Sequence, residues 1–252
     1  MTHMLAAPVD LREVAILLDV DGTLLDLAAT PREVFVPPSL RETLAVLLDK
    51  TGGALALVSG RPLSDLDMIF APLQLPAVGG HGAEIRVAAG GAADRGRAAP
   101  LGDDVKRLFA SIAAASPGIL IEDKGYSVAL HYRLAPEMEQ YVHNAVIQLS
   151  ERLSDRFELL PGKAVIEIKP GGFDKGTAVR HLMTCHPFAG RRPVFVGDDT
   201  TDEAAFAVLP EFSGVGISVG RRIPGVAMCF DAPPDVRMWL EQISQVEEAP
   251  AE

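Results

Sequence analysis

The residue types best suited to chemistry occur in four short stretches of the chain. Asp19 and Asp21 are two residues apart, Ser59 and Lys175 stand farther along, and a cluster of acids fills the range 198–203. Carboxylates placed close together repel one another, so such a group would need a cation to stay ionised. Ligands that are all oxygen atoms favour a hard cation, most simply Mg²⁺.

These residue types could together transfer a phosphoryl group. Asp19 could attack phosphorus and form an aspartyl-phosphate. Asp21 could protonate the leaving alcohol and then activate water, and Ser59 could hydrogen-bond a phosphoryl oxygen. Mg²⁺ and Lys175 would neutralise the charge where one anion attacks another. Taken singly, each residue also fits an ordinary turn, helix cap or solvated surface position, so the hypothesis requires that they converge.

The apolar runs that precede these residues predict that the reactive side chains lie close together in the fold. Continuous apolar runs at 14–18, 54–58 and 193–196 are typical of strands buried on both faces, and each one stops where a reactive stretch begins. Helical patterns separate the runs, including one after Pro38 with a capping-box spacing at Ser39 and Glu42. This alternation predicts an α/β fold with a doubly wound, Rossmann-like parallel sheet, whose ligands lie beyond the carboxyl ends of its strands.

The alternation is interrupted by a stretch with a different pattern. Residues 102–169 suggest a helix, a strand pair, a second helix and a second strand pair, with hairpin turns at Lys124-Gly125 and Pro161-Gly162. We therefore predict a core domain of residues 1–86 and 172–252 and an inserted α+β cap domain of residues 87–171. The cap is expected to cover the active site and select the substrate.

The strand pattern of the insertion predicts one polar face. Side chains two residues apart on a strand share a face, which would gather carboxylates and cations on the side opposite the apolar residues. The expected members are Glu122, Lys124, His131, Arg133, Glu167 and Lys169. Such a face suits a ligand rich in hydroxyl groups, but a solvated sheet face with cross-strand ion pairs explains the same pattern.

Composition excludes several classes of function. The chain of 252 residues carries a net charge of -11, which argues against a nucleic-acid partner. No apolar run reaches the roughly 20 residues that span a bilayer, and the N-terminus does not resemble a signal peptide. The two cysteines lack a metal-type spacing, which favours a reducing, cytoplasmic location. We expect a monomer that acts on a small molecule without a membrane or nucleic-acid partner.

The four reactive stretches, taken in order, resemble the motifs of the haloacid dehalogenase superfamily of phosphatases. The resemblance implies that Asp19 is the nucleophile and Asp21 the general acid/base. It implies that Mg²⁺ is held by the side chains of Asp19 and Asp198 and by the main-chain carbonyl of Asp21. Asp199 and Asp202 would support the metal site.

Further blocks are similar to those of the trehalose-6-phosphate phosphatase family over nearly the whole chain. They are the opening Asp19–Pro31 block, Ser59–Pro62, His81–Glu84, Glu122–Lys124 with His131–Arg133, Gly162-Lys163 with Glu167, and Gly197–Glu203. The resemblance implies that Glu122, Lys124 and Glu167 contact glucose hydroxyls. It suggests Arg61, His131, Arg133 and Lys163 as further substrate-binding residues.

The resemblance therefore predicts a stand-alone, Mg²⁺-dependent phosphatase that hydrolyses trehalose 6-phosphate in trehalose biosynthesis. Three alternatives remain open on the sequence. One is a phosphatase of another sugar phosphate, such as sucrose phosphate or a mannosyl phosphoglycerate. Another is a catalytically silent protein that binds a sugar phosphate. The third is a phosphomutase of the same superfamily, which would be revealed by transfer in place of hydrolysis.

Overall fold

The computed structural model describes residues 10–28, 33–95, 99–153 and 157–246. The chain divides into two compact units, one formed by Met1–Asp94 with Asp174–Glu252 and the other by Arg95–Phe173. The boundaries expected from the sequence lie at 86/87 and 171/172. Each unit has its own sheet and its own hydrophobic core.

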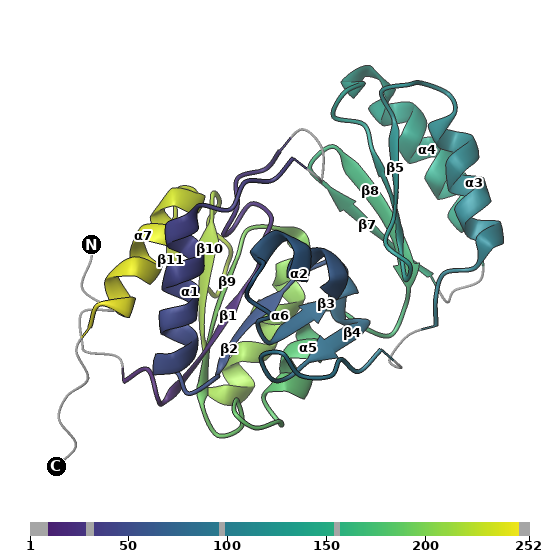
Figure 1. Cartoon of the computed structure of the whole chain (residues 1–252). Helices are drawn as coiled ribbons and strands as arrows, with labels where there is room; N and C mark the ends of the chain where they lie inside the picture. The colour runs from purple at the N-terminus through teal and green to yellow at the C-terminus, as the bar shows by residue number, and fades with distance from the viewer. Residues whose placement is uncertain (1–9, 29–32, 96–98, 154–156, 247–252) are drawn as a thin grey trace, which may run out of the picture. The chain divides into compact units, whose positions relative to one another are not determined.

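The first unit is built on a seven-stranded sheet in the order β11-β10-β9-β1-β2-β3-β4 (Figure 1). All neighbouring strands run parallel except β3 and β4, so the predicted parallel α/β sheet is confirmed. Its strands are β1 (Val14–Leu18), β2 (Leu55–Val58), β3 (Ala77–Gly79), β4 (Glu84–Arg86), β9 (Arg192–Gly197), β10 (Val215–Val219) and β11 (Met228–Phe230).

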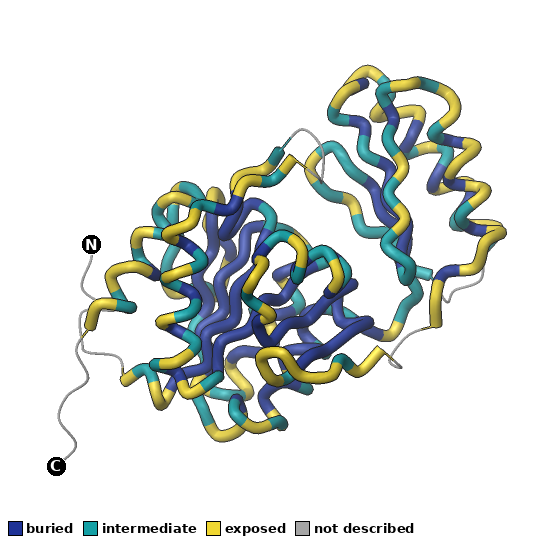
Figure 2. Tube along the Cα trace, in the orientation of Figure 1, coloured by how far each residue is buried: buried dark blue, intermediate teal, exposed yellow. Residues whose placement is uncertain are grey.

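Helices cover both faces of this sheet and create two separate cores (Figure 2). Alternate residues of β1 point to opposite faces. Ile16 and Leu18 pack with α1 (Pro38–Lys50), α2 (Leu63–Phe70) and α7 (Pro233–Ser244). Ala15 and Leu17 pack on the other face, with the helices α5 (Lys175–Leu182) and α6 (Glu203–Val208). The strand is therefore buried on both sides, which explains its unbroken apolar sequence.

One sequence expectation for this unit is wrong, and two of its strands have no expectation in the sequence analysis. Ser39 lies inside α1, which begins at Pro38 after Pro37, and no side chain caps the helix. A proline fits the first helical position because its fixed φ suits the helix and its missing N–H would have no partner there. The strands β3 and β4 were not predicted, since they are only three residues long and are joined through Gly80–Gly82.

The second unit is a four-stranded antiparallel sheet in the order β5-β6-β8-β7, with two helices packed against its apolar side. Its elements are α3 (Asp103–Ala113), β5 (Leu120–Asp123), β6 (Val128–His131), α4 (Glu139–Ser150), β7 (Phe157–Gly162) and β8 (Val165–Pro170). Val128, Leu130, Ile166 and Ile168 point into this core, as their alternation predicts.

The hairpin turn expected at Pro161-Gly162 is displaced by two residues. Both residues belong to β7, where Pro161 pairs with Ile166 and Gly162 with Val165. The turn is formed by Lys163 and Ala164, and Ala164 has a positive φ of 59°. Proline and glycine suggested a turn, but the cross-strand pairing of the apolar residues sets the register instead.

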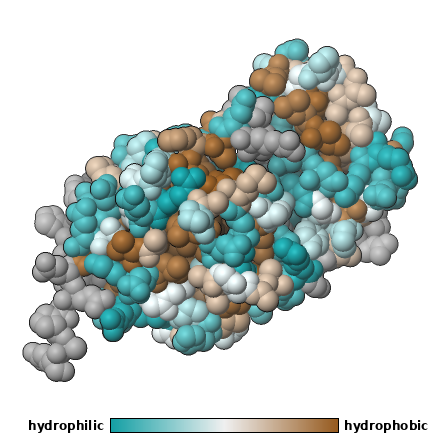
Figure 3. All heavy atoms as spheres, viewed as in Figure 1, coloured by the Kyte–Doolittle hydropathy of each residue, from teal (hydrophilic) through white to brown (hydrophobic). Residues whose placement is uncertain are grey.

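None of the helices in the described part of the chain has the length and apolar character that crossing a membrane requires. The face shown in Figure 3 mixes hydrophilic and apolar residues. Within the described ranges, Phe35 and Met68 are the most exposed large apolar side chains.

Candidate active site

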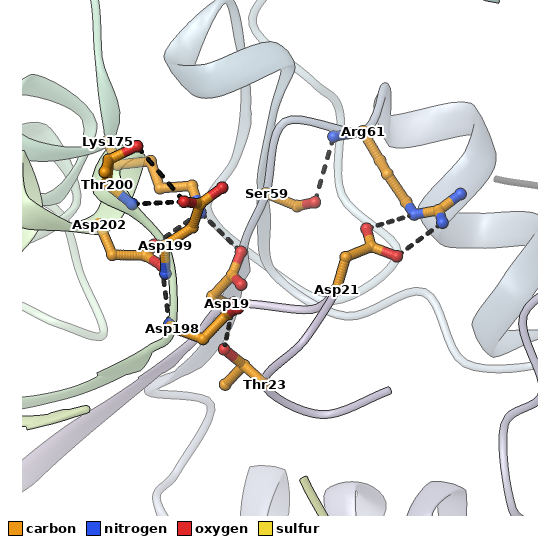
Figure 4. Close-up of polar contacts among 10 residues, drawn as sticks. All are labelled: Asp19, Asp21, Thr23, Ser59, Arg61, Lys175, Asp198, Asp199, Thr200 and Asp202. Carbon is orange, nitrogen blue, oxygen red and sulfur yellow. Dashed lines mark hydrogen bonds and ion pairs between the residues drawn. The ribbon is translucent and has the colours of Figure 1, made fainter. Parts of the chain in front are cut away.

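The reactive residues of the core unit lie at one edge of its sheet, beyond the carboxyl ends of β1, β2 and β9 (Figure 4). β1 is central, with Leu18 paired to Leu57 of β2 and to Val196 of β9. Asp19 follows β1 and donates its backbone N–H to the carbonyl of Val196 over 2.9 Å. Parallel pairing of these strands therefore places their terminal loops side by side, as the sequence predicts.

Lys175 joins the loops of β1 and β9 from the first position of α5. Its Nζ donates to Asp19 Oδ1 and to Asp202 Oδ1, each over 2.6 Å. Asp174 caps the helix, because its carboxylate accepts from Thr177 N and its own N–H donates to Thr177 Oγ1. This reciprocal cap fixes the start of α5 and hence the origin of the lysine side chain.

Burial makes this ion cluster electrostatically unusual. Asp19, Lys175 and Asp202 are all nearly inaccessible to solvent. Burial and the charge of Asp202 raise the pKa of Asp19 from 3.8 to about 7, although Lys175 opposes the shift. Burial also raises the pKa of Asp202, again against the effect of Lys175. Burial alone would lower the pKa of Lys175, but the two carboxylates outweigh it and raise that pKa.

Asp202 is held from two sides and in turn shapes the loop after β9. Its Oδ2 accepts from the backbone N–H groups of Asp198 and Asp199, over 3.0 and 2.9 Å. A Cβ at Gly197 would lie 2.5 Å from the Asp202 carboxyl carbon, so only glycine allows this approach. One Asp202 oxygen therefore contacts Lys175, and the other contacts the backbone of the Asp198 loop.

Asp198 is buried and lies against the loop after β1. Thr23 Oγ1 donates to Asp198 Oδ1 over 3.3 Å. Gly22 has a φ of +84°, and a Cβ there would lie 2.4 Å from Asp198 Oδ2. The contact to Thr23 was not predicted as a separate interaction, although Thr23 belongs to the Asp19-Val-Asp-Gly-Thr23 stretch. Arg221, which belongs to none of the motifs, donates to the Asp198 carbonyl over 3.4 Å.

Asp21 points to a different partner from Asp19 (Figure 4). Its carboxylate accepts from Arg61 Nε over 2.6 Å and from Arg61 Nη2 over 2.7 Å, which is a bidentate ion pair. Ser59 is buried, and its Oγ accepts from the backbone N–H of Arg61. The structure thus brings Asp21, Ser59 and Arg61 into one group beside the Asp19 cluster.

Asp199 is less enclosed than its neighbours. Its Oδ1 accepts from Thr200 N over 2.6 Å and caps the short 3₁₀ turn Thr200–Asp202. Its place in the loop is therefore that of a structural cap beside the cluster.

The carboxylates fit a divalent cation. Asp19, Asp198 and Asp202 each offer an oxygen, and these oxygens lie within 4.8 Å of one another. Three carboxylates and one ammonium leave two negative charges when all are ionised. A hard divalent cation would neutralise them and is suited to oxygen ligands.

The second unit carries its own polar network on the sheet. Glu122 Oε2 lies 2.8 Å from His131 Nε2, and Lys124 Nζ donates to Glu167 Oε2 over 2.7 Å. Lys124 is also 3.8 Å from Glu122, so the two pairs are continuous. Burial would raise the pKa of Glu122, but the hydrogen bond from His131 and the charge of Lys124 hold it below its usual value.

Two other predicted residues of this face behave differently. Arg133 Nη2 donates to the carbonyl of Lys163 over 3.3 Å, beside the turn between β7 and β8. Lys169 was expected on an open face, but only 1% of it is exposed. Its Nζ donates to Glu158 Oε2 over 2.6 Å and to the Phe173 carbonyl, which ties the end of the unit to its sheet.

Solved structures with this fold include enzymes of sugar-phosphate chemistry. The C-terminal domain of C. albicans trehalose-6-phosphate phosphatase superimposes with a TM-score of 0.83 at 21% identity, covering 94% of this chain and 93% of that one. A trehalose-6-phosphate phosphatase related protein superimposes with a TM-score of 0.77 at 25% identity, covering 91% of this chain and 96% of that one. These likenesses support a haloacid dehalogenase-type core with a cap domain.

Sequence comparison gives closer relatives. A probable trehalose-phosphate phosphatase of Sinorhizobium fredii is 44% identical over 222 residues, which cover 87% of this chain and 82% of the relative. The trehalose-6-phosphate phosphatase of Escherichia coli is 38% identical over 229 residues, covering 90% and 85%. The sequence model of the trehalose-phosphatase family matches residues 17–224. The chain is therefore a member of the trehalose-phosphatase family of enzymes.

Proposed function

We propose that this protein hydrolyses trehalose 6-phosphate to trehalose and phosphate, with Mg²⁺, through an aspartyl-phosphate on Asp19. The two relatives described above carry that activity in their names, and the similarity covers most of each chain. A role in trehalose biosynthesis follows from this reaction.

The observation that carries the mechanism is the bridge made by Lys175. It places a buried ammonium 2.6 Å from Asp19 Oδ1, beside two further buried carboxylates. A buried carboxylate beside a fixed cation is suited to attack an anionic phosphoryl group, since the cation offsets the repulsion between them.

Asp19 and Asp21 perform the two half-reactions. Asp19 Oδ2 attacks phosphorus, since Oδ1 already accepts from Lys175. The bond from phosphorus to the sugar oxygen breaks, and Asp21 gives its proton to that oxygen. A water molecule then attacks phosphorus, Asp21 takes a proton from it, and the bond from phosphorus to Asp19 breaks to release phosphate. Ser59 hydrogen-bonds a phosphoryl oxygen.

Mg²⁺ would be held by the side chains of Asp19 and Asp198 and by the main-chain carbonyl of Asp21. Asp199 and Asp202 support these ligands through the loop after β9. The donor set of closely spaced carboxylate oxygens fits such a cation. When bound, the cation would neutralise charge on the phosphoryl oxygens.

The sugar is bound by the polar face of the inserted unit. We assign the main contacts with glucose hydroxyls to Glu122, Lys124 and Glu167, whose charged groups form a continuous network. Carboxylates accept hydrogen bonds from hydroxyl groups, and ammonium groups donate hydrogen bonds to them. The network can therefore bind the sugar hydroxyls both as donors and as acceptors. The further substrate-binding residues of this unit are His131, Arg133 and Lys163.

The test is phosphate release from a panel of sugar phosphates with Mg²⁺, with EDTA and Asp19→Asn as controls. We expect turnover of trehalose 6-phosphate and none in either control. Turnover of sucrose phosphate or a mannosyl phosphoglycerate in its place would refute the substrate while keeping the core chemistry. Binding without turnover would refute the enzymatic proposal, and wild-type activity in Asp19→Asn would refute the nucleophile.

A further inference from the structure

The bidentate pair between Arg61 and Asp21 is the strongest interaction of the proposed general acid/base. Two N–H groups of one guanidinium reach the two carboxylate oxygens over 2.6 and 2.7 Å. Arg61 is buried, whereas about a third of the Asp21 side chain is exposed. A bidentate contact fixes the plane of a carboxylate as well as its position, which a single hydrogen bond does not.

Arg61 is itself held on a rigid base. Its backbone N–H donates to Ser59 Oγ over 3.1 Å, and its carbonyl accepts from Gly80 N over 2.9 Å. The carbonyl of Ser59 accepts from His81 N over 3.0 Å. His81 has a positive φ of 57°, and a Cβ at Gly60 would lie 2.4 Å from its Nε2. The loop after β2 is therefore braced by the segment between β3 and β4.

The two carboxylates of the Asp19-Val-Asp21 stretch are turned toward different cations. Asp19 is held by Lys175 on the side of β9, and Asp21 by Arg61 on the side of β2 (Figure 4). Phosphoryl transfer places the attacking and leaving oxygens roughly in line, on opposite sides of phosphorus. A nucleophile and an acid only two residues apart must therefore be kept pointing in different directions.

We propose that Arg61 is the positioning residue of the general acid/base: its side-on contact holds the plane of the Asp21 carboxyl group apart from Asp19 and leaves the outward lone pair of an Asp21 oxygen to carry the proton that the leaving oxygen receives. This inference rests on the proposed function and assigns Arg61 a task that acts through Asp21. It differs from direct substrate binding, in which loss of Arg61 would weaken catalysis whether or not Asp21 is intact.

The experiment is a double-mutant cycle on the phosphorylation step. Trehalose 6-phosphate cleavage is followed in single turnovers at saturating substrate for wild type, Arg61→Gln, Asp21→Asn and the double variant. A general acid contributes about 10²–10⁴-fold, so we expect Asp21→Asn to slow the step by that order. Arg61→Gln should slow it by about 10²-fold, and adding it to Asp21→Asn should have almost no further effect.

A second readout uses the leaving group. The anion of 4-nitrophenol departs without a proton, so its release from 4-nitrophenyl phosphate should be much less sensitive to Arg61→Gln than release of the sugar. Arg61→Lys keeps the charge but loses the two-point contact, and we expect an intermediate defect. Arg86→Gln is the matched control, because Arg86 makes a similarly buried bidentate pair with Asp67 on the same unit. It should leave both readouts at the wild-type level.

The outcomes separate this inference from the function on which it rests. A normal Asp21→Asn defect with an unimpaired Arg61→Gln, or additive losses in the double variant, would refute the positioning role alone. Full activity of Asp21→Asn, or wild-type protein without turnover, would refute the proposed function and the inference with it. If Arg61→Gln fails to fold, the same comparisons are made with Arg61→Lys.

Discussion

Replacing Lys175 by Met should destabilise the core unit by an amount that increases with pH. The ammonium of Lys175 lies 2.6 Å from both Asp19 and Asp202, and all three side chains are buried. Methionine fills a similar volume but leaves two carboxyl groups facing each other without a cation. They would have to remain protonated in the folded state, which becomes harder as pH rises.

The magnitude follows from the pKa of Asp19. In wild-type protein without a divalent cation, this pKa is raised from 3.8 to about 7. The folded state then binds more protons than the unfolded chain, so stability falls as pH rises from about 4 to about 7 and levels off above that. Without Lys175, which lowers the pKa of Asp19, the decline should continue past pH 8. The Asp19 carboxyl should thus make the penalty of the substitution grow by up to about 1.4 kcal/mol between pH 7 and pH 8.

Urea unfolding in EDTA at pH 5, 6, 7 and 8 would measure this difference. Trp239, the only tryptophan, lies in α7 and reports on the core unit. Arg86→Met is the control, since it removes a buried cation from the same unit but leaves Asp67 able to reach water. Its penalty should stay constant between pH 7 and pH 8.

Parallel stability curves for wild type and Lys175→Met above pH 7 would refute the reasoning. They would show that the two carboxyl groups ionise in the folded state without their cation. Restoration of the wild-type curve by adding Asp202→Asn to Lys175→Met would identify Asp202 as one source of the penalty.

Three further predictions test other parts of the molecule. Mg²⁺ should raise the melting temperature more at pH 7.5 than at pH 5, because its carboxylate ligands must be ionised, and Asp198→Asn should abolish the shift in a thermal denaturation assay. Gly22→Ala should lower kcat by at least about 10-fold. Gly22 has a positive φ, and an added Cβ would lie 2.4 Å from Asp198 Oδ2, so the loop after β1 would be displaced. An unchanged kcat would contradict this expectation. Glu122→Gln should lower kcat/KM for trehalose 6-phosphate by about 10-fold without changing hydrolysis of 4-nitrophenyl phosphate. Asp123→Asn is its control, because Asp123 lies on the opposite face of the sheet, where it pairs with Lys106. Equal losses in both variants would argue against selective sugar binding.

The sheet of the core could be predicted because its signals are local and strong. The runs that became β1, β2 and β9 are apolar on both faces, and each is followed directly by polar residues. Parallel strands align their carboxyl ends, so the approach of Asp19 to Asp198 follows from topology. The bridge through Lys175 also needed α5 to begin at that residue, which the cap by Asp174 ensures.

Other features depend on tertiary context that a single sequence does not display. Burial of Lys169 results from its contacts with Glu158 and the Phe173 carbonyl, although its strand alternation predicts an open face. The pairing of Arg61 with Asp21 joins residues 40 positions apart, and neither residue type nor spacing distinguishes it from a contact with substrate. Such pairings depend on which loops meet, which only the folded structure shows.

The charge of each network also indicates what each unit is suited to bind. In the core, three carboxylates face one ammonium within a buried cluster, which leaves an excess of negative charge that a divalent cation would offset. In the network on the inserted sheet, both carboxylates already have a partner, Glu122 with His131 and Glu167 with Lys124. A phosphate with its cation matches the first arrangement, and a neutral sugar that exchanges hydrogen bonds matches the second, since it adds no charge to a network of paired groups. We therefore expect the core cluster to act on the phosphoryl group and the network on the inserted sheet to select which alcohol is released.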